Sequence, residues 1–368
     1  MKTHRFGILA RPLAGALLAL GISPSLPAPA AGVVKVLEQE DFSLELGLRV
    51  QPRMELKPVS GSDGGTDWQR DFLVRRLRLK AYGRMITAKY GFEVKIDGTD
   101  QIGSNPTAQV ENAWIQYHLV GALDVRAGLY DQPFSRERLT SDSRQLVVDR
   151  TEVSSVPEAA GLADNAVGFH FLGKGGGGHA EYAVGLFDNV KIPGTFQNFP
   201  MVVGRLDLNL GSTKSVFQDT HFENESWCSV GVNGSYQGSI EDTSGADDGL
   251  TATMGIDGMI DIPAGPGRLF LRAEANAVKT QRPGAEKIDT AVWMAGVGYL
   301  IAGRFQPAVV FDQVRLDDAV GGGVSNITYL GVNFYQKSHS LKVQGDVRLA
   351  SGTGESVDGG RIQAQLDF

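Results

Sequence analysis

The chain has 368 residues, with 35 Lys and Arg against 42 Asp and Glu, which gives a formal net charge of −7 at pH 7. An acidic chain lacks the basic surface on which nucleic-acid binding depends, so nucleic acid is not an expected partner. The single cysteine, Cys228, excludes an intramolecular disulfide. This length suggests two globular domains unless the chain forms a barrel, because barrels run long as one unit.

The N-terminus predicts a secretory signal peptide. Three basic residues precede a short apolar run over residues 12–22, and small residues follow up to Ala30. That run is too short to cross a bilayer, which takes about 20 apolar residues. Cleavage after Ala30 removes no acidic residue and leaves 32 basic against 42 acidic residues, a formal charge of −10. We therefore expect a signal peptide over residues 1–30, an N-terminal lead-in over 31–42 and a transmembrane barrel over 43–368.

Apolar and polar residues alternate from about residue 43 to the end, which is typical of β-strands. In the segment 72–83, for example, the alternation places Leu73, Leu77 and Leu79 on one face. Arg76, Arg78 and Lys80 lie on the opposite face. Most runs approach the length of roughly 9–11 residues that a tilted strand needs to cross a bilayer. The runs predict about 16 strands, over residues 43–53, 72–83, 88–97, 108–119, 122–130, 165–172, 179–187, 202–210, 226–236, 249–261, 267–278, 290–300, 303–314, 325–335, 341–349 and 361–368.

The connections favour a membrane barrel over an exported soluble β-sandwich, which is the alternative for such a pattern. Short turns, as at Ala302–Gly303, alternate with longer Gly-, Ser- and Asp-rich loops, an asymmetry typical of outer-membrane barrels. The chain also ends on its apolar face with Phe368. One connection, residues 131–164, exceeds the roughly 15 residues above which loops are uncommon unless functional. We expect it to fold inward and narrow the channel.

A family resemblance accompanies this long segment. Residues 126–141 read RAGLYDQPFSRERLTS, which resembles a motif of the phosphate-selective porin O and P family. The matching residues are Arg126, Gly128, Pro133, Phe134, Ser135, Glu137, Leu139, Thr140 and Ser141. The upstream Arg75, Arg76, Arg78 and Leu79 resemble another strand of that family. The resemblance implies a 16-stranded antiparallel all-β barrel of the bacterial outer membrane, usually trimeric, that conducts anions.

An anion pore needs cations in its lumen, because Arg and Lys replace part of the hydration that the ion loses. Arginine in particular offers paired donors to a phosphate. The basic residues in lumen phase are therefore the anion-path candidates: Arg76, Arg78, Lys80, Lys95, Arg126, Arg205, Arg272, Lys342, Arg348 and Arg361. The constriction candidates in the long segment are Pro133, Phe134, Ser135, Arg136 and Arg138, with Arg144 and Arg150 further along. Acidic residues in the same phase could instead pair with these bases and make them ordinary wall.

The sequence thus predicts an outer-membrane porin for passive diffusion of small anions, with phosphate or related oxyanions favoured. A general or differently selective porin, and a structural or adhesive barrel, remain alternatives. No G-x-S-x-G, H-E-x-x-H or C-x-x-C motif is present, so neither an enzyme nor a cofactor or metal is expected. The expected partners are small anions, outer-membrane lipid and further copies of the chain in a homotrimer.

Overall fold

The structure is a computed structural model that describes residues 34–60, 66–86, 89–99, 107–162, 165–188, 195–197, 199–211, 217–352 and 359–368. The predicted signal peptide lies outside these residues and stays a prediction. Within the described part of the chain, no helix combines the length and the apolar character needed to cross a membrane.

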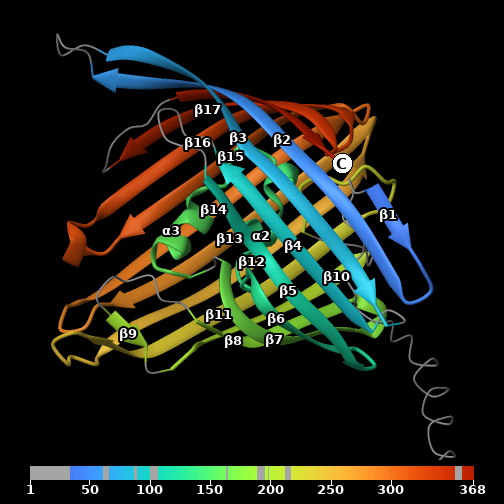
Figure 1. Cartoon of the computed structure of the whole chain (residues 1–368). Coiled ribbons are helices and arrows are strands. Elements are labelled where there is room, and N and C mark those ends of the chain that lie inside the picture. The colour runs from blue at the N-terminus through green and yellow to red at the C-terminus, as the bar shows by residue number, and fades with distance from the viewer. Residues whose placement is uncertain are drawn as a thin grey trace, which may run out of the picture.

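Sixteen long strands form a closed antiparallel barrel, as the sequence predicted (Figure 1). Neighbours along the chain pair with one another, and the first and last long strands, β2 and β18, close the ring. Two short strands were not predicted: β1 (Val34–Glu38) pairs with β2, and β9 (Thr195–Gln197) pairs with β11. The long strands are β2 (Phe42–Ser60), β3 (Thr66–Met85), β4 (Tyr90–Thr99), β5 (Thr107–Val120), β6 (Leu123–Asp131), β7 (Asn165–Gly175), β8 (Ala180–Asp188), β10 (Met201–Gly211), β11 (Trp227–Asp242), β12 (Gly249–Ala264), β13 (Gly267–Gln281), β14 (Lys287–Ile301), β15 (Phe305–Leu316), β16 (Gly323–Lys337), β17 (Leu341–Gly352) and β18 (Gly359–Asp367).

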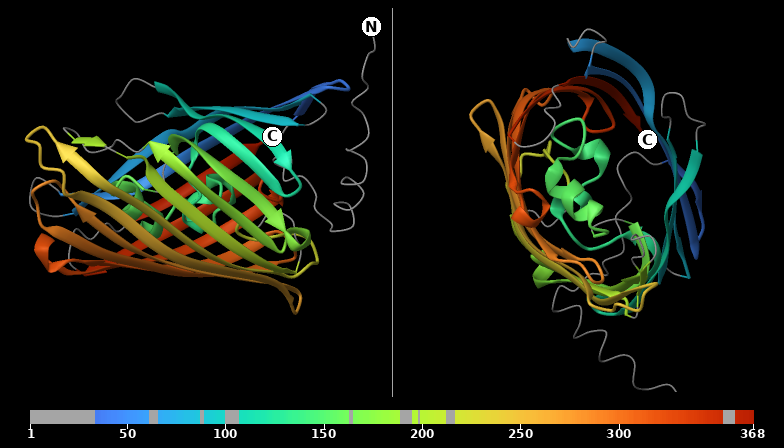
Figure 2. Two further views of the ribbon diagram at one scale, coloured as in Figure 1. Left: turned by 90° about the horizontal axis from the view of Figure 1, so that it is seen from below. Right: turned by 90° about the vertical axis from the view of Figure 1, so that its left-hand side faces the viewer.

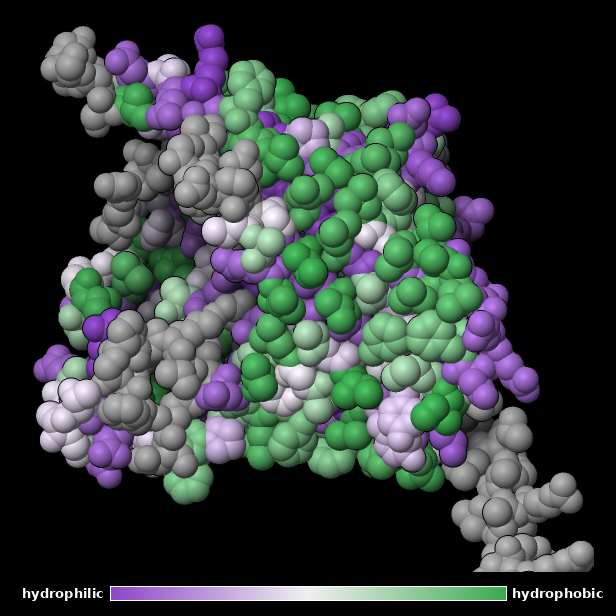
Figure 3. Space-filling model, in the orientation of Figure 1, coloured by the Kyte–Doolittle hydropathy of each residue, from purple (hydrophilic) through white to green (hydrophobic). Residues whose placement is uncertain are grey.

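The alternation of the sequence separates an apolar outer wall from a polar lumen. On β3, Leu77 and Leu79 are 48% and 57% exposed, whereas Arg78 and Lys80 between and after them are 4% and 5% exposed. Figure 3 shows the same pattern over one outer face, where apolar residues form a broad band and hydrophilic residues gather towards the ends. Such a band suits contact with lipid, because a lipid-facing wall cannot solvate charged side chains.

The predicted phase of β3 is wrong at Leu73. The pairing of β3 with β2 shifts between Gln51↔Arg76 and Pro52↔Val74, which leaves Arg75 as an extra residue. An extra residue of this kind is a β-bulge, and it reverses the face on which the preceding residues lie. Leu73 therefore stands opposite the lumen-facing Arg53, and Phe72, 73% exposed, takes the outer position.

The long segment after β6 carries short helices that contact lumen-facing side chains. They are α2 (Arg136–Leu139), the 3-10 turn η1 (Asp142–Arg144) and α3 (Glu152–Ala159). Figure 2 shows the two α-helices surrounded by the ring of strands when the barrel is viewed from one end. Leu146, Val147 and Val153 pack with Met294, Val310 and Tyr329 of the wall in one buried cluster. The segment thus lies against the wall of β13 to β16.

A second connection also enters the barrel, and the sequence analysis did not anticipate it. Antiparallel pairing places the connection between β10 and β11 at the opposite end of the barrel from that between β6 and β7. Within this connection, Asp219 donates its backbone N–H to the carbonyl oxygen of Arg144 at 2.9 Å. Its carboxylate accepts from the backbone N–H of Leu146 at 2.7 Å. The two segments therefore meet inside the barrel.

Candidate functional site

The residues of the sequence motif hold the inward segment in place. Gly128 has φ +133°, and a Cβ there would lie 2.2 Å from the carbonyl oxygen of Ala113 on β5, so this position requires glycine. Phe134 is fully buried in a cluster with Tyr130 and Phe187. Ser135 is the N-cap that precedes α2, and its hydroxyl accepts a hydrogen bond from the backbone N–H of Arg138 at 3.2 Å. This cap satisfies one of the free N–H groups at a helix start.

Charged side chains of α2 anchor the segment to the wall. Arg136 donates to Asp257 at 2.6 Å and to Ser229 at 2.8 Å, on β12 and β11. Glu137 accepts from Arg272 of β13 at 2.7 Å and from the backbone N–H of Thr151 at 3.0 Å. Buried charges in these positions are satisfied by their partners, so they act as structural links. Arg136 and Arg272, both proposed from sequence, fall into this group.

The opposite side of the lumen contains a cavity of about 290 Å³, which we call the basic chamber. It lies between the inward segment and the wall of β2 to β6. Four carboxylates line it, against seven basic residues, an excess of three positive charges. The basic residues are Arg49, Arg78, Lys80, Lys95, Arg138, Arg144 and Arg150, and the carboxylates are Glu111, Asp131, Asp142 and Asp367.

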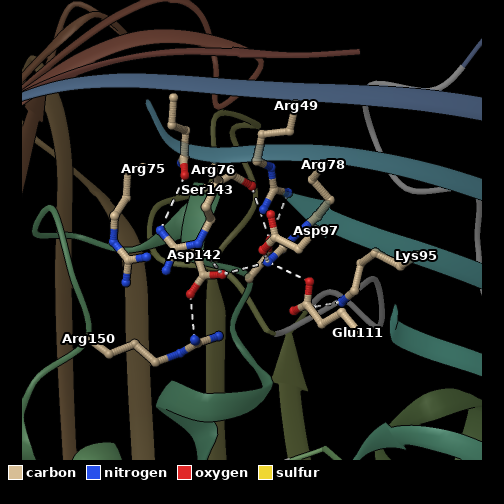
Figure 4. A network of polar contacts seen from close by, with 12 residues as sticks. Arg49, Arg75, Arg76, Arg78, Lys95, Asp97, Glu111, Asp142, Ser143 and Arg150 are labelled. Carbon is tan, nitrogen blue, oxygen red and sulfur yellow. Dashed lines mark hydrogen bonds and ion pairs between the residues drawn. The ribbon is translucent and has the colours of Figure 1, made fainter. Parts of the chain in front are cut away.

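Asp142 is the centre of an ion-pair network in this chamber (Figure 4). Its carboxylate lies 2.5 Å from Arg150, 3.2 Å from Arg76 and 3.5 Å from Arg78. Burial alone would raise the pKa of Asp142, but the three arginines outweigh it and hold that pKa well below its ordinary value. Asp142 is therefore ionised at neutral pH and ties the inward segment to β3.

The predicted ladder on β3 faces the lumen, yet each of its members has an acidic partner. Arg78 contacts Asp97 and Glu111, both at 2.6 Å. Lys80 contacts Asp367 at 2.7 Å. These pairs reduce the charge that is available to a passing anion. The sequence analysis allowed for this outcome, because acidic residues share the lumen phase with these bases.

Arg144 differs from the other arginines of the basic chamber. It is half-buried, and among the described residues its guanidinium makes neither an ion pair nor a hydrogen bond. Burial lowers the pKa of Arg144, and the positive charge of Arg49 lowers it further. A guanidinium is nevertheless too basic to lose its proton in a protein, so Arg144 remains charged. Arg144 thus adds to the chamber a positive charge that no described carboxylate holds in an ion pair, although the carboxylate of Asp367 acts on it from a longer distance.

A second chamber of about 160 Å³ lies against β6, β7, β8 and β10. Arg126 lines it, and its guanidinium donates to Gln116 at 2.7 Å and stacks 4.1 Å above the ring of Trp114. No carboxylate within the described residues forms an ion pair with Arg126. His170, opposite Arg126 in the β6–β7 register, is buried, and neither ring nitrogen has a hydrogen-bond partner among the described residues.

The remaining candidates do not gather at one place in the structure. Arg205 of the second chamber pairs with Asp207 at 2.5 Å and with Asp257 at 2.7 Å. Arg348 lies 3.7 Å from Glu152 of α3. Lys342 is buried 5.9 Å from the Tyr335 ring, and its Nζ has no hydrogen-bond acceptor among the described residues. Arg138 pairs with Glu158 at 3.0 Å, and Pro133 lines the second chamber.

Sequence reasoning missed several contributors to the basic chamber, among them Arg49, Asp367 and Phe217. Arg49 and Asp367 face each other across the closure of the barrel, 2.7 Å apart, although 318 residues separate them along the chain. The alternation of the sequence assigns both residues to the lumen face, but their pairing depends on closure of the barrel. Phe217 lies in the connection that enters from the opposite end, and no motif marks it. Within the described residues, no group of three or more His, Cys, Asp and Glu side chains could hold a metal.

The comparisons with known proteins agree with this architecture. The family described as phosphate-selective porin O and P matches residues 45–349, most of the chain. The protein belongs to the phosphate-selective porin O and P family. This confirms the resemblance that the motif indicated, and it places this porin in the bacterial outer membrane. An uncharacterised protein of Aquifex aeolicus is 24% identical over 349 residues, covering 84% of this chain and 83% of the relative.

Solved porins share the fold of this family member at low sequence identity. The channel DcaP of Acinetobacter baumannii covers 90% of this chain and 99% of its own, with a TM-score of 0.61 and 13% identity. An anion-selective porin from Comamonas acidovorans covers 89% and 100%, with a TM-score of 0.61 and 12% identity. The trimer form of OmpT of Vibrio cholerae covers 89% and 100%, with a TM-score of 0.60 and 9% identity. The closed barrel fold is therefore common to all of them.

Proposed function

We propose that this porin conducts small anions by passive diffusion and that it favours phosphate or a related oxyanion. The excess of three positive charges around the basic chamber carries the proposal. A confined site with this excess lowers the barrier for an anion and raises it for a cation, because low-dielectric walls strengthen the field of the lining charges. Membership of the phosphate-selective family and the likeness to an anion-selective porin support the same function.

Arg144 is the residue that we propose as the main anion contact. An anion at Arg144 meets a charge that no described carboxylate holds in an ion pair, with Arg49 and Lys80 in the same chamber. A guanidinium also offers planar paired donors, which suit the oxygens of phosphate. Arg76, Arg78 and Lys80 contribute to the field around the site, while their ion pairs hold the chamber together.

Arg126 supplies a second contact further along the proposed path. Its lack of an ion-pair partner among the described residues and its place in the second chamber favour a direct role. The other arginine of that chamber, Arg205, is held by two aspartates and contributes to the wall. We propose that the inward segment, rather than the strands alone, sets the width of the path.

The zero-current potential of the purified protein in planar bilayers under a salt gradient tests the proposed selectivity. A potential that favours the anion, with chloride current reduced by added phosphate, is the expected result. A preference for cations with no effect of phosphate would refute it and indicate a general porin of the same fold. A preference for anions without phosphate block would retain anion conduction and remove the oxyanion preference.

We propose further that the porin assembles as a homotrimer. The likeness to the trimer form of Vibrio cholerae OmpT supports this assembly. Mass measurement of the detergent-purified complex, corrected for bound detergent, gives the number of chains directly. Three chains of 39.4 kDa before signal-peptide removal set the upper limit of the expected protein mass. A monomer under conditions that preserve the barrel would contradict the proposal.

A further inference from the structure

The two chambers of the lumen share three lining residues, namely Asp131, Leu139 and Phe217. These residues therefore stand between the chambers. Asp131 is held by an ion pair with Arg138 at 3.3 Å, which leaves Leu139 and Phe217 as the apolar members of the partition. The basic chamber lies on one side of this partition, and the chamber of Arg126 and His170 lies on the other.

We propose that Leu139 and Phe217 form an apolar constriction that a permeating anion must pass between the two chambers, and that this pair sets the conductance and the size limit of the pore. The inference rests on the proposed anion conduction, since it concerns the path of the same solute. It assigns a specificity-determining role to a residue of each of the two inward connections.

Both side chains lie close to residues that anchor the two inward connections. Leu139 is the last residue of α2, whose start is capped by Ser135 and whose Arg136 is bound to the wall. Phe217 lies near Asp219, whose carboxylate binds the backbone of Leu146 and lies 2.8 Å from Arg272. A side chain carried by such backbone keeps its place in the lumen, so the pair can define a fixed width.

Charged groups close to the Phe217 ring make an apolar residue unexpected at this position. The guanidinium carbons of Arg136 and Arg205 lie 5.5 Å and 5.3 Å from the ring centre. The aspartates Asp207 and Asp257 neutralise both arginines. The ring therefore lies beside paired charges and lines both chambers with an apolar side chain, as a hydrophobic constriction requires.

The physical effect follows from hydration. An anion crossing an apolar constriction loses water contacts that neither side chain replaces, and such constrictions can exclude water altogether. The positive excess of the basic chamber raises the local concentration of anions beside it, which partly offsets that cost. A constriction of this kind slows anions that are larger or more strongly hydrated than chloride, so phosphate held in the basic chamber passes it slowly and reduces the chloride current.

Single-channel recording in planar bilayers tests the proposal with Phe217→Ala, Leu139→Ala and the double variant. Each single substitution should raise chloride conductance by about twofold, since the narrowest section limits the current through a pore. The double variant should differ from the product of the two single effects, because the side chains share one gap. Phe217→Leu, which keeps an apolar side chain, should stay closer to the wild type than Phe217→Ser.

Phe222→Ala is the matched control. Phe222 lies in the same connection, packs on Tyr335 and His339 with ring centres 5.0 Å and 5.3 Å away, and lines neither chamber. Unchanged conductance in Phe222→Ala together with a rise in Phe217→Ala supports the constriction. An equal rise in both variants would overturn it, because loosening of the whole connection would then explain the current.

Two further outcomes separate this proposal from the proposed function. If the wild type prefers anions and Phe217→Ala conducts as the wild type does, the constriction is wrong and anion conduction stands. If the wild type shows no anion preference, the proposed function fails. The constriction is then tested by the swelling rate of proteoliposomes in neutral sugars of increasing size. Phe217→Ala should raise this rate most for the larger sugars. An unchanged size limit in Phe217→Ala would contradict the constriction.

Discussion

Replacing Arg144 with alanine should weaken phosphate block of the chloride current more than any other single removal of a lumen arginine. The reason is that Arg144 has no ion pair or hydrogen bond from its guanidinium within the described residues, whereas Arg78 is bound to two carboxylates at 2.6 Å. Removing a paired arginine leaves its acidic partners unpaired and disturbs the wall. Removing Arg144 subtracts one charge from a basic chamber whose excess is three.

Coulomb's law gives the size of the effect. A guanidinium about 5 Å from a monovalent anion contributes roughly 0.8 kcal/mol in bulk water and roughly 3 kcal/mol at an effective dielectric constant of 20. These energies correspond to about a 4-fold and about a 150-fold change in affinity. The chamber is confined but in contact with water, so the loss should lie between these limits.

The assay is titration of the chloride current with phosphate for the wild type, Arg144→Ala, Arg144→Lys and Arg304→Ala. Arg144→Lys keeps the charge without the planar donors and should recover part of the affinity. Arg304 lies exposed in the turn between β14 and β15 and serves as the matched control, with no expected effect. A loss of less than twofold in Arg144→Ala, with Arg304→Ala unchanged, would refute the assignment of Arg144 as the main contact.

Three further predictions concern the inward segment and its motif. Asp142→Asn should leave Arg76 and Arg150 without their shared carboxylate and destabilise the inward segment by about 3–5 kcal/mol. The loosened segment should increase the current noise in single-channel records, and records as steady as those of the wild type would contradict this prediction. Because the folded pKa of Asp142 is depressed, its ion pairs are complete above the unfolded pKa of about 3.9 and are lost only as the pH falls towards the folded value. Asp142 should therefore cause no change of conductance between pH 8 and about pH 5 in bilayer records, and a transition in this range that is present in the wild type and lost in Asp142→Asn would contradict this reasoning. Gly128→Ala should reduce the yield of heat-modifiable folded barrel on semi-native gels, since a Cβ would clash with the β5 backbone, and a normal yield would show that β5 can move aside.

The strands were predictable from the sequence because each one carries its own signal. Alternation along a strand assigns its two faces without knowledge of the partners, and it identified all sixteen long strands. The signal fails where the backbone departs from regular pleating, as at Arg75, because a bulge changes the phase without changing the composition. The position of Leu73 was wrong for this reason.

The ion pairs of the site were not predictable, because they join residues that only the closed barrel brings together. Lys80 and Asp367 lie 2.7 Å apart, yet 287 residues separate them along the chain. The lumen phase of Arg76, Arg78 and Lys80 was assigned correctly, but phase does not reveal which of several acids each base will meet. The total charge was equally uninformative, since a chain with a net charge of −7 lines its main lumen chamber with an excess of positive charge.

The division of roles among the arginines follows from what holds the inward segment. Asp142 requires Arg76 and Arg150, and Glu137 requires Arg272, because each of these carboxylates is buried and would otherwise be left without a counter-charge. Arg144 has no such duty, since its guanidinium forms no ion pair within the described residues, while its backbone carbonyl accepts from the N–H of Asp219. The side chain of Arg144 therefore has no anchoring role, although its backbone is fixed at this point. An unpaired charge on fixed backbone is what binding of a passing anion requires, because the site is then neither neutralised beforehand nor costly to order.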